Sequence, residues 1–102
     1  MASSAKLIWQ SAEGEEQAFD LGEPVTTIGR DEESDIHLTE ALVSRNHARI
    51  ERRDGVFYVQ DIGSTNWTRV NDEVVSERAL VDGDEVRFGR AFCVFRLVSD
   101  EP

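Results

Sequence analysis

The sequence predicts an all-β domain built from many short strands. In several short stretches apolar and polar side chains alternate, which places the apolar ones on one face of a strand. Glycine-containing turn pairs separate these stretches at short intervals. The alternative over residues 41–53 is a helix with Thr39 as its N-cap, but the apolar spacing there suits a helix poorly. Short strands with regular turns indicate a β-sandwich or barrel.

The first part of the chain contains three expected strands and a fourth candidate. Lys6–Gln10 and Gln17–Asp20 flank the turn-like segment 11–14. Val25–Gly29 is rich in β-branched and apolar residues, which strands favour. His37 lies between two apolar residues, and we expect it to be a strand residue as well.

A hairpin is expected in the middle of the chain. Ala48–Arg53 alternates, and Val56–Asp61 does the same on the other side of Asp54-Gly55. Glycine tolerates positive φ, so this pair suits a tight hairpin turn.

The last part of the chain repeats this pattern. Asp82-Gly83 is a second turn of the hairpin kind, followed by the alternating segment Glu85–Phe88. Gly89-Arg90 then turns the chain into Ala91–Val98. Cys93 lies within that apolar run, which favours a buried and inert thiol.

Length and charge limit the classes of function. The 102 residues suffice for one domain, and no apolar run approaches the roughly 20 residues of a membrane-spanning helix. A formal net charge of -10 disfavours nucleic acids and anionic membranes as partners. A single cysteine and the lack of a signal-peptide pattern favour a cytoplasmic protein. Two histidines and that cysteine, widely spaced, form no recognisable metal site.

Arginine, hydroxyl and amide side chains occur where the expected strands end. Arg30 ends one strand, Ser44 and Arg45 precede another, and residues 64–66 follow a third. If these loops gather at one end of a sandwich, they bring together hydrogen-bond donors from distant parts of the chain. A phosphate group carries about -1.5 to -2 charges and strong acceptor oxygens, and an arginine can bond two of them at once. The loops therefore suggest a phosphate-binding site.

Several short segments of the chain, taken together, form a recognisable series. They are Gly29-Arg30, Ser44-Arg45-Asn46-His47, Asp61-Ile62-Gly63-Ser64-Thr65-Asn66, Val70-Asn71, Gly83-Asp84 and Phe88-Gly89. In order and spacing they resemble the forkhead-associated (FHA) domain family over about residues 24–97. The resemblance implies an FHA-type β-sandwich of about eleven short strands, occupying residues 5–98 between loose termini at 1–4 and 99–102. It also implies that end loops bind phosphothreonine in an extended peptide, with no catalysis and no cofactor.

The resemblance assigns a role to each of five binding residues. Arg30 matches an arginine that supports the phosphate and its loops, and Ser44 matches a serine that bonds a phosphate oxygen. Arg45 occupies an often basic position that reaches the phosphate. Thr65 matches a position beside the phosphothreonine, and Asn66 matches the asparagine that holds the ligand backbone.

The resemblance assigns support of the site to Gly29 and His47, and one departure from the family matters for the ligand. His47 matches a histidine that holds the binding loop from behind. The family usually has glycine after the asparagine, whereas here Trp67 follows Asn66. Tryptophan at positive φ is strained. Either this loop takes a different path, or the indole turns outward and adds an apolar wall near the peptide.

The predicted function is phosphothreonine-dependent protein–protein interaction in kinase signalling. The ligand is a partner protein or a tail of the full-length chain itself. One alternative is a phosphate-independent scaffold or intramolecular regulatory module of the same fold. A hydrolase triad of Ser44, His47 and Asp61 is a further alternative, but the sequence lacks the strand-turn-helix elbow and an oxyanion loop.

Overall fold

The computed structural model describes residues 4–11 and 13–98, and these form eleven β-strands and no helix. The described residues therefore contain no helix that could cross a membrane. The strands are β1 (Ser4–Gln10), β2 (Glu16–Asp20), β3 (Val25–Gly29), β4 (Ile36–His37), β5 (Ala48–Arg53), β6 (Val56–Asp61), β7 (Thr68–Val70), β8 (Glu73–Val75), β9 (Glu77–Ala79), β10 (Glu85–Phe88) and β11 (Ala91–Val98).

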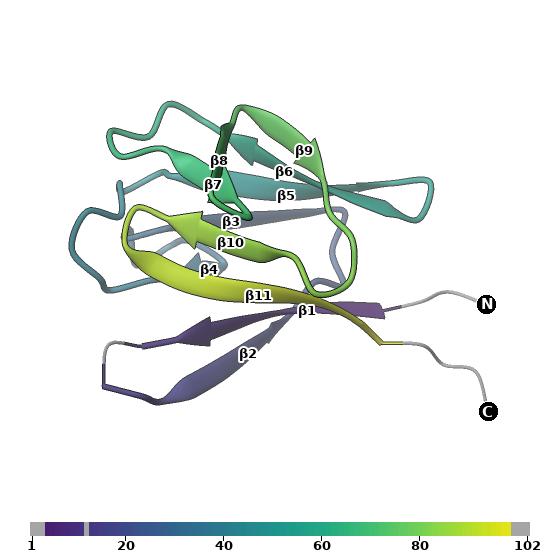
Figure 1. Ribbon diagram of the computed structural model, residues 1–102, viewed down its shortest axis with the longest axis horizontal. Helices are drawn as coiled ribbons and strands as arrows, with labels where there is room; N and C mark the ends of the chain where they lie inside the picture. Colours follow the sequence, from purple (N-terminus) through teal and green to yellow (C-terminus); the bar gives the residue numbers. More distant parts are fainter. Residues whose placement is uncertain (1–3, 12, 99–102) are drawn as a thin grey trace.

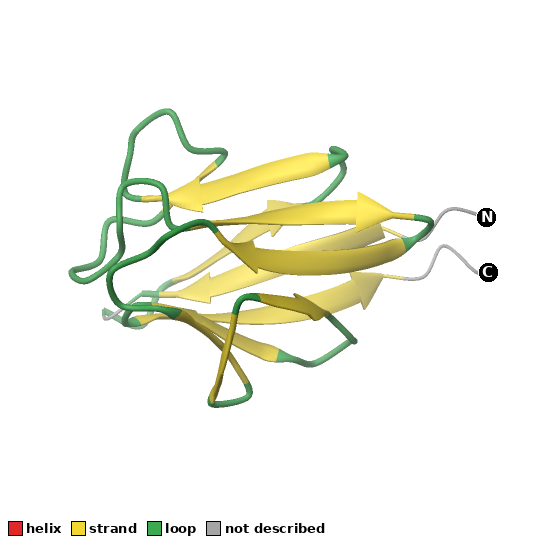
Figure 2. Cartoon of the chain, turned by 90° about the horizontal axis from the view of Figure 1, so that it is seen from above, coloured by secondary structure: helices red, strands yellow, loops and turns green. Residues whose placement is uncertain are grey.

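The strands form two sheets, which confirms the all-β sandwich. One sheet has the order β2-β1-β11-β10-β7-β8, and the other has the order β4-β3-β5-β6-β9. The paired strands run antiparallel, except for β3 and β4, which run parallel. The connections β3–β4, β4–β5, β6–β7 and β10–β11 gather at one end (Figure 1). β1 begins and β11 ends at the opposite end (Figure 2).

Alternation along the strands places the apolar core between the two sheets. Ile50 of β5 and Phe57 of β6 come from one sheet, and Leu7 of β1, Phe88 of β10 and Phe95 of β11 come from the other. Each of these five side chains is at most 2% exposed. The tilted ring pair Phe57 and Phe95, with centroids 5.5 Å apart, joins the two layers. Burial of this interface stabilises the sandwich and fixes which strand ends meet.

Cys93 lies in the same core and is fully buried, as expected. Burial favours the neutral thiol and raises its pKa well above the ordinary value. The thiolate is the reactive form, so this cysteine is an apolar core residue in practice.

The helix considered as an alternative over residues 41–53 is absent, because residues 41–47 form a loop with turns and bends and 48–53 form β5. One expectation from a local pattern is wrong. Asp82-Gly83 does turn, with Gly83 at φ 92, but it joins β9 of one sheet to β10 of the other and forms no hairpin. A turn signal fixes local backbone geometry and does not identify the strand that follows as a partner.

Other local expectations hold. Asp54 and Gly55 have φ values of 52° and 81°, and β5 pairs with β6 around them as a hairpin. One bound needs correction: Ser4, placed in the loose N-terminal segment, is the first residue of β1 because it pairs with Val98. The rest of the two expected loose ends, residues 1–3 and 99–102, lies outside the described residues.

Candidate functional site

Three loops enclose an open depression of about 720 Å³ at the end of the sandwich. They connect β3 to β4, β4 to β5 and β6 to β7. All five residues that the sequence assigns to ligand binding line this depression, although the loops are distant in sequence. The lining residues are Arg30, Thr39, Glu40, Ala41, Leu42, Val43, Ser44, Arg45, Thr65 and Asn66.

Arg30 is held by the neighbouring loop and still has donors to offer. Its backbone N–H donates to the carbonyl of Ser44 at 3.0 Å, and its Nε donates to the carbonyl of Val43 at 3.0 Å. Among the described residues its terminal guanidinium nitrogens have no hydrogen-bond or ion-pair partner. The guanidinium is thus oriented through one nitrogen and left with its planar fork free, which suits a phosphate.

Gly29 allows the two arginine-bearing loops to come together. A Cβ at this position would lie 2.0 Å from the backbone carbonyl oxygen of Arg45. No side chain fits at that distance. Glycine is therefore needed here for close approach of the two backbones.

Ser44 connects its loop to the β6–β7 loop. Its Oγ accepts a hydrogen bond from the backbone N–H of Thr65 at 3.0 Å, so the hydroxyl hydrogen is left to donate. Asn66 makes a second connection, donating from Nδ2 to the carbonyl of Leu42 at 3.1 Å. The amide oxygen of Asn66 accepts no hydrogen bond from the described residues.

His47 is a buried support for both loops. Its Nδ1 accepts the backbone N–H of Ser44 at 3.1 Å, and its Nε2 lies 2.9 Å from the carbonyl oxygen of Trp67. This pattern requires a neutral ring with its proton on Nε2. Burial lowers the pKa of His47, which favours the same neutral form. With both nitrogens engaged on the backbone, His47 cannot act as a base toward the Ser44 hydroxyl, so no triad is assembled.

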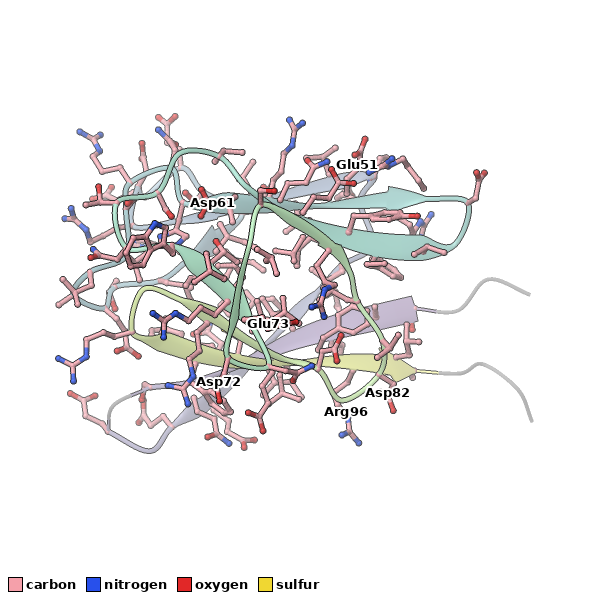
Figure 3. All side chains as sticks on the ribbon, turned by 45° about the horizontal axis from the view of Figure 1, so that its top comes forward. Glu51, Asp61, Asp72, Glu73, Asp82 and Arg96 are labelled. Atoms are coloured by element: carbon pink, nitrogen blue, oxygen red, sulfur yellow. The ribbon has the colours of Figure 1, made fainter. Side chains whose placement is uncertain are left out.

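Asp61 supports the β6–β7 loop, a role that sequence reasoning did not assign to it. Its carboxylate accepts the backbone N–H groups of Gly63 and Ser64, both at 2.9 Å, and the Thr68 hydroxyl at 2.8 Å. It also accepts the Ser64 hydroxyl. Partial burial opposes ionisation, but these hydrogen bonds outweigh it and lower the pKa of Asp61. An aspartate two residues before a glycine is the turn signal that identifies this role. Figure 3 shows Asp61 toward the loop end of the molecule.

Trp67 adopts a left-handed backbone conformation, which glycine accepts more readily than any other residue. Its φ is 65°, and its side chain is 56% exposed. The carbonyl of Trp67 accepts the N–H of Gly89 at 3.2 Å besides the bond from His47. These two bonds hold the backbone of Trp67 in place at positive φ, and the indole turns outward.

Acidic groups border the depression and shape its charge. Asp31 pairs with Arg45 at 3.5 Å, and its pKa is lowered chiefly by the backbone N–H of Glu33. Glu40 accepts the indole N–H of Trp9 at 2.9 Å.

A neighbouring depression of about 1010 Å³ shares residues 39–41 and has four glutamates in its lining, so it does not suit an anion. No three His, Cys, Asp or Glu side chains of residues 4–11 and 13–98 lie close enough to hold a metal ion.

Comparison with known proteins places this geometry in context. Residues 26–89 match the family model of the FHA domain. The oxoglutarate dehydrogenase inhibitor of Corynebacterium diphtheriae is 50% identical over 80 residues, which is 78% of this chain and 53% of that protein. The glycogen accumulation regulator GarA of Mycolicibacterium smegmatis is 41% identical over 97 residues, covering 95% of this chain and 59% of GarA. The chain thus spans little more than half the length of these relatives.

A solved structure has the same fold. It comes from a structural and functional analysis of phosphothreonine-dependent FHA domain interactions and superimposes with a TM-score of 0.83 at 33% identity. The alignment covers 91% of this chain and 95% of that one.

Proposed function

The chain belongs to the FHA domain family, and from this premise we propose that it binds phosphothreonine in partner proteins. The binding unit is residues 5–98, and the site is the depression between the three end loops. The module recruits a phosphorylated protein in signalling and has no catalytic activity of its own. It acts in the cytoplasm.

One observation carries this proposal: side-chain donors from two of the three loops converge on one depression, and intramolecular bonds leave them partly unused. The Arg30 fork, the Ser44 hydroxyl hydrogen and the weakly paired Arg45 all border it. Unused donors around a cavity need an acceptor-rich ligand. A dianionic phosphate supplies acceptor oxygens and the opposite charge.

The expected strength is moderate. A hydrogen bond to a charged group contributes about 1.5–3 kcal/mol. Two or three such bonds, set against the cost of association, correspond to micromolar binding, or about -8 kcal/mol. Binding of this strength is reversible when a kinase and a phosphatase exchange the mark.

The test is titration of the whole chain with phosphothreonine peptides from a random library, each paired with its unphosphorylated form. Saturable micromolar binding of phosphorylated peptides alone supports the proposal. Equal binding of both forms contradicts it and favours the scaffold alternative, for which the exposed indole of Trp67 is the one specific observation. Phosphoserine and phosphotyrosine peptides of the same sequence define the class of phosphate recognised.

A further inference from the structure

The outer face of the six-stranded sheet carries two arginines in direct cross-strand register. Arg69 of β7 pairs with Arg87 of β10 in the antiparallel ladder. The residues before and after each arginine are buried in the core, so alternation directs both arginine side chains outward, and both are exposed. Residues in this register have Cβ atoms about 4.5–5.5 Å apart. The two guanidinium groups are therefore neighbours on one surface.

Neither arginine of this pair has an acidic partner in the part of the chain that the structure describes. Glu85 lies on the same face, two residues before Arg87, and is not within ion-pair distance of either arginine. Like charges directly opposite one another destabilise a sheet. The chain has 21 acidic residues against 11 lysines and arginines, so the composition does not explain why this pair is left uncompensated.

The other basic residues on this face of the sheet are compensated. Lys6 of β1 pairs with Asp20 of β2 at 3.5 Å. Arg96 of β11, which is opposite Lys6 in the ladder, pairs with Asp82 at 3.7 Å. The uncompensated charge is thus local to the two neighbouring arginines.

An aromatic ring orients one arginine of the pair. The Arg87 guanidinium lies over the ring of Phe92, 5.0 Å from its centroid. Phe92 of β11 is opposite Arg87 in the ladder and lies on the same outer face. Stacking on a ring fixes the plane of a guanidinium and does not use its hydrogen-bond donors. Arg87 is therefore held in place while its donors stay available to a ligand.

Apolar side chains lie on both sides of the arginines. Val74 of β8 is opposite Arg69 and is 56% exposed. On the other side, Ile8 of β1 is opposite Val94 of β11, and both are partly exposed. Val94 is two residues from Phe92, about 7 Å along the strand. Strands β1, β11 and β10, which carry most of this surface, lie side by side (Figure 1).

We propose that this surface, the arginine face, binds an acidic, extended segment of a partner protein. A carboxylate between the two arginines accepts hydrogen bonds from both and removes their mutual repulsion. An aliphatic side chain two positions further along an extended segment is about 7 Å away and reaches the apolar row. The arginine face lies on the flat of a sheet and needs no phosphate, so it goes beyond the proposed function and does not depend on it. It consists of Ile8, Arg69, Val74, Arg87, Phe92 and Val94.

Charge favours a protein segment over an anionic membrane as the occupant. The chain has a formal net charge of -10, and an extended negative surface would repel it as a whole. A short segment meets chiefly the two arginines, because at physiological salt charges beyond about 8 Å are largely screened.

The probe is a set of short unphosphorylated peptides with the core Glu-X-Leu, where X varies. Matched sets carry Lys-X-Leu or Glu-X-Ser. Binding is followed through the backbone amide signals of the isotope-labelled chain, which report both the affinity and the place of binding. The chains compared are the wild type, Arg69→Gln, Arg87→Gln and the control Arg52→Gln. Arg52 is exposed and has no side-chain partner among the described residues, but it belongs to β5 in the other sheet.

We expect the Glu-X-Leu peptides to shift the amide signals of β7, β10 and β11. Their affinity should exceed that of the other two sets by at least about fivefold, and Arg69→Gln and Arg87→Gln should each reduce it by a similar factor. Arg52→Gln changes the net charge by the same amount and should leave the affinity unchanged. The comparison separates a local contact from the total charge of the chain.

Thermal unfolding of the free chain gives a second measurement. Arg69→Gln removes the like-charge contact, so its midpoint should rise by about 1–4 °C, whereas that of Arg52→Gln should not. A variant that is more stable and binds less cannot owe its lost binding to misfolding. A fall in the Arg69→Gln midpoint would show that favourable contacts hold this arginine, and the inference would fail.

The arginine face is also overturned if no Glu-X-Leu peptide binds, or if Lys-X-Leu peptides bind as well. Unchanged affinity in both arginine variants, an equal loss in Arg52→Gln, or shifts confined to the end loops has the same consequence. Vesicles containing phosphatidylserine test the membrane: binding to them that requires Arg69, without binding of the peptides, would assign the face to lipid and overturn the inference. Titration with phosphothreonine peptides tests the proposed function separately, and its outcome does not alter these results.

Discussion

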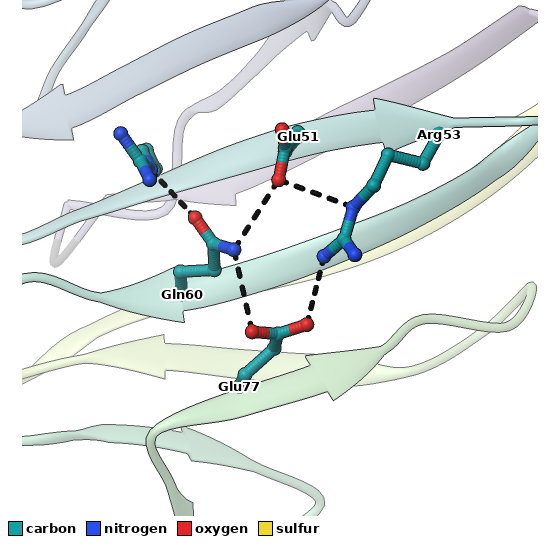
Figure 4. Close-up of polar contacts among 5 residues, drawn as sticks. Glu51, Arg53, Gln60 and Glu77 are labelled. Carbon is teal, nitrogen blue, oxygen red and sulfur yellow. Dashed lines mark hydrogen bonds and ion pairs between the residues drawn. The ribbon is translucent and has the colours of Figure 1, made fainter.

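Two polar regions of this molecule use the same kinds of side chain in opposite ways. On the outer face of the five-stranded sheet, Arg53 pairs with Glu51 at 3.2 Å and with Glu77 at 2.8 Å. Gln60 donates to both glutamates and accepts from Arg49. Figure 4 shows the closed ring of Glu51, Arg53, Gln60 and Glu77. With Arg49, these residues form the sheet-face network. Bonding to Arg53 lowers the pKa of Glu77.

At the loop end the bonds of the arginines are incomplete. Arg30 uses Nε alone, and Arg45 reaches a single carboxylate at 3.5 Å. The difference teaches that the number of arginines does not locate a binding site. What distinguishes the loop end is that the backbone orients the donors and leaves them without acceptors, so the acceptor must come from a ligand.

The largest expected effect comes from filling the contact between the two arginine-bearing loops. In Gly29→Ala the new Cβ meets the Arg45 carbonyl, and the loops must separate. We expect a loss of about 2 kcal/mol or more of unfolding free energy, together with loss of phosphopeptide binding. Denaturant unfolding and peptide titration measure the two. Gly22→Ala is the control, because its Cβ would meet nothing within 4 Å. Equal stability of the two variants would contradict the role given to Gly29.

Removing one arginine from the loop end and one from the sheet-face network tests the difference between these two regions. Arg30→Ala should weaken phosphothreonine binding at least tenfold, about 1.4 kcal/mol, and Ser44→Ala should have a similar effect. Arg53→Ala removes an arginine whose partners are all internal, so it should leave binding unchanged and reduce stability slightly. Calorimetric titration of the three variants decides. Wild-type affinity in both folded pocket variants would place the phosphate elsewhere.

Acidification should act on the loop end through His47. Burial lowers its pKa in the folded protein, so the unfolded chain takes up a proton first as the pH falls. The stability contributed by the neutral ring is present above its unfolded pKa of about 6.5 and decreases below it. Denaturant unfolding between pH 7.5 and 5.5 measures this. The dependence should survive in His37→Gln, and its disappearance there would assign it to His37.

The smallest effect concerns the acid in the depression. Glu40 lines it and carries the same sign of charge as the phosphate. In Glu40→Gln the amide still accepts the indole N–H of Trp9, and the repulsion is removed. We expect binding to strengthen by about twofold to fivefold, with a smaller gain at high salt. An unchanged affinity at low salt would show that Trp9 already holds the carboxylate out of range.

Local patterns predict the long strands and leave the short ones out. β5 and β6 alternate around a glycine turn, so their pairing follows from the sequence. β7, β8 and β9 have three residues each, too few for alternation to distinguish a strand from a loop. Their existence follows from the resemblance to the family, and their positions follow from packing.

The candidate site also has a part that the sequence predicts and a part that it does not. Side-chain donors at strand ends, such as Arg30 and Ser44, can be identified from the sequence because the residue type alone determines which groups they can donate. The backbone carbonyls of Leu42, Val43 and Trp67 cannot, because every residue has one and the tertiary structure selects which is used. Trp67 is instructive: its departure from glycine is visible in the sequence, but the retained left-handed backbone depends on bonds from His47 and Gly89.

The pairing of Ser4 with Val98 has a consequence for how this domain can be joined to other polypeptide. The first and last strands are neighbours. Polypeptide joined to this domain would therefore enter and leave at the end of the sandwich opposite the loop end, where the ligand is proposed to bind. The domain can therefore be grafted into a surface loop of a host protein without separating the ends of that loop. The eight residues of β11 span about 25 Å between the two ends of the sandwich. A phosphothreonine tethered to either end needs a linker of at least about eight residues to reach the pocket, and its local concentration then depends on linker length.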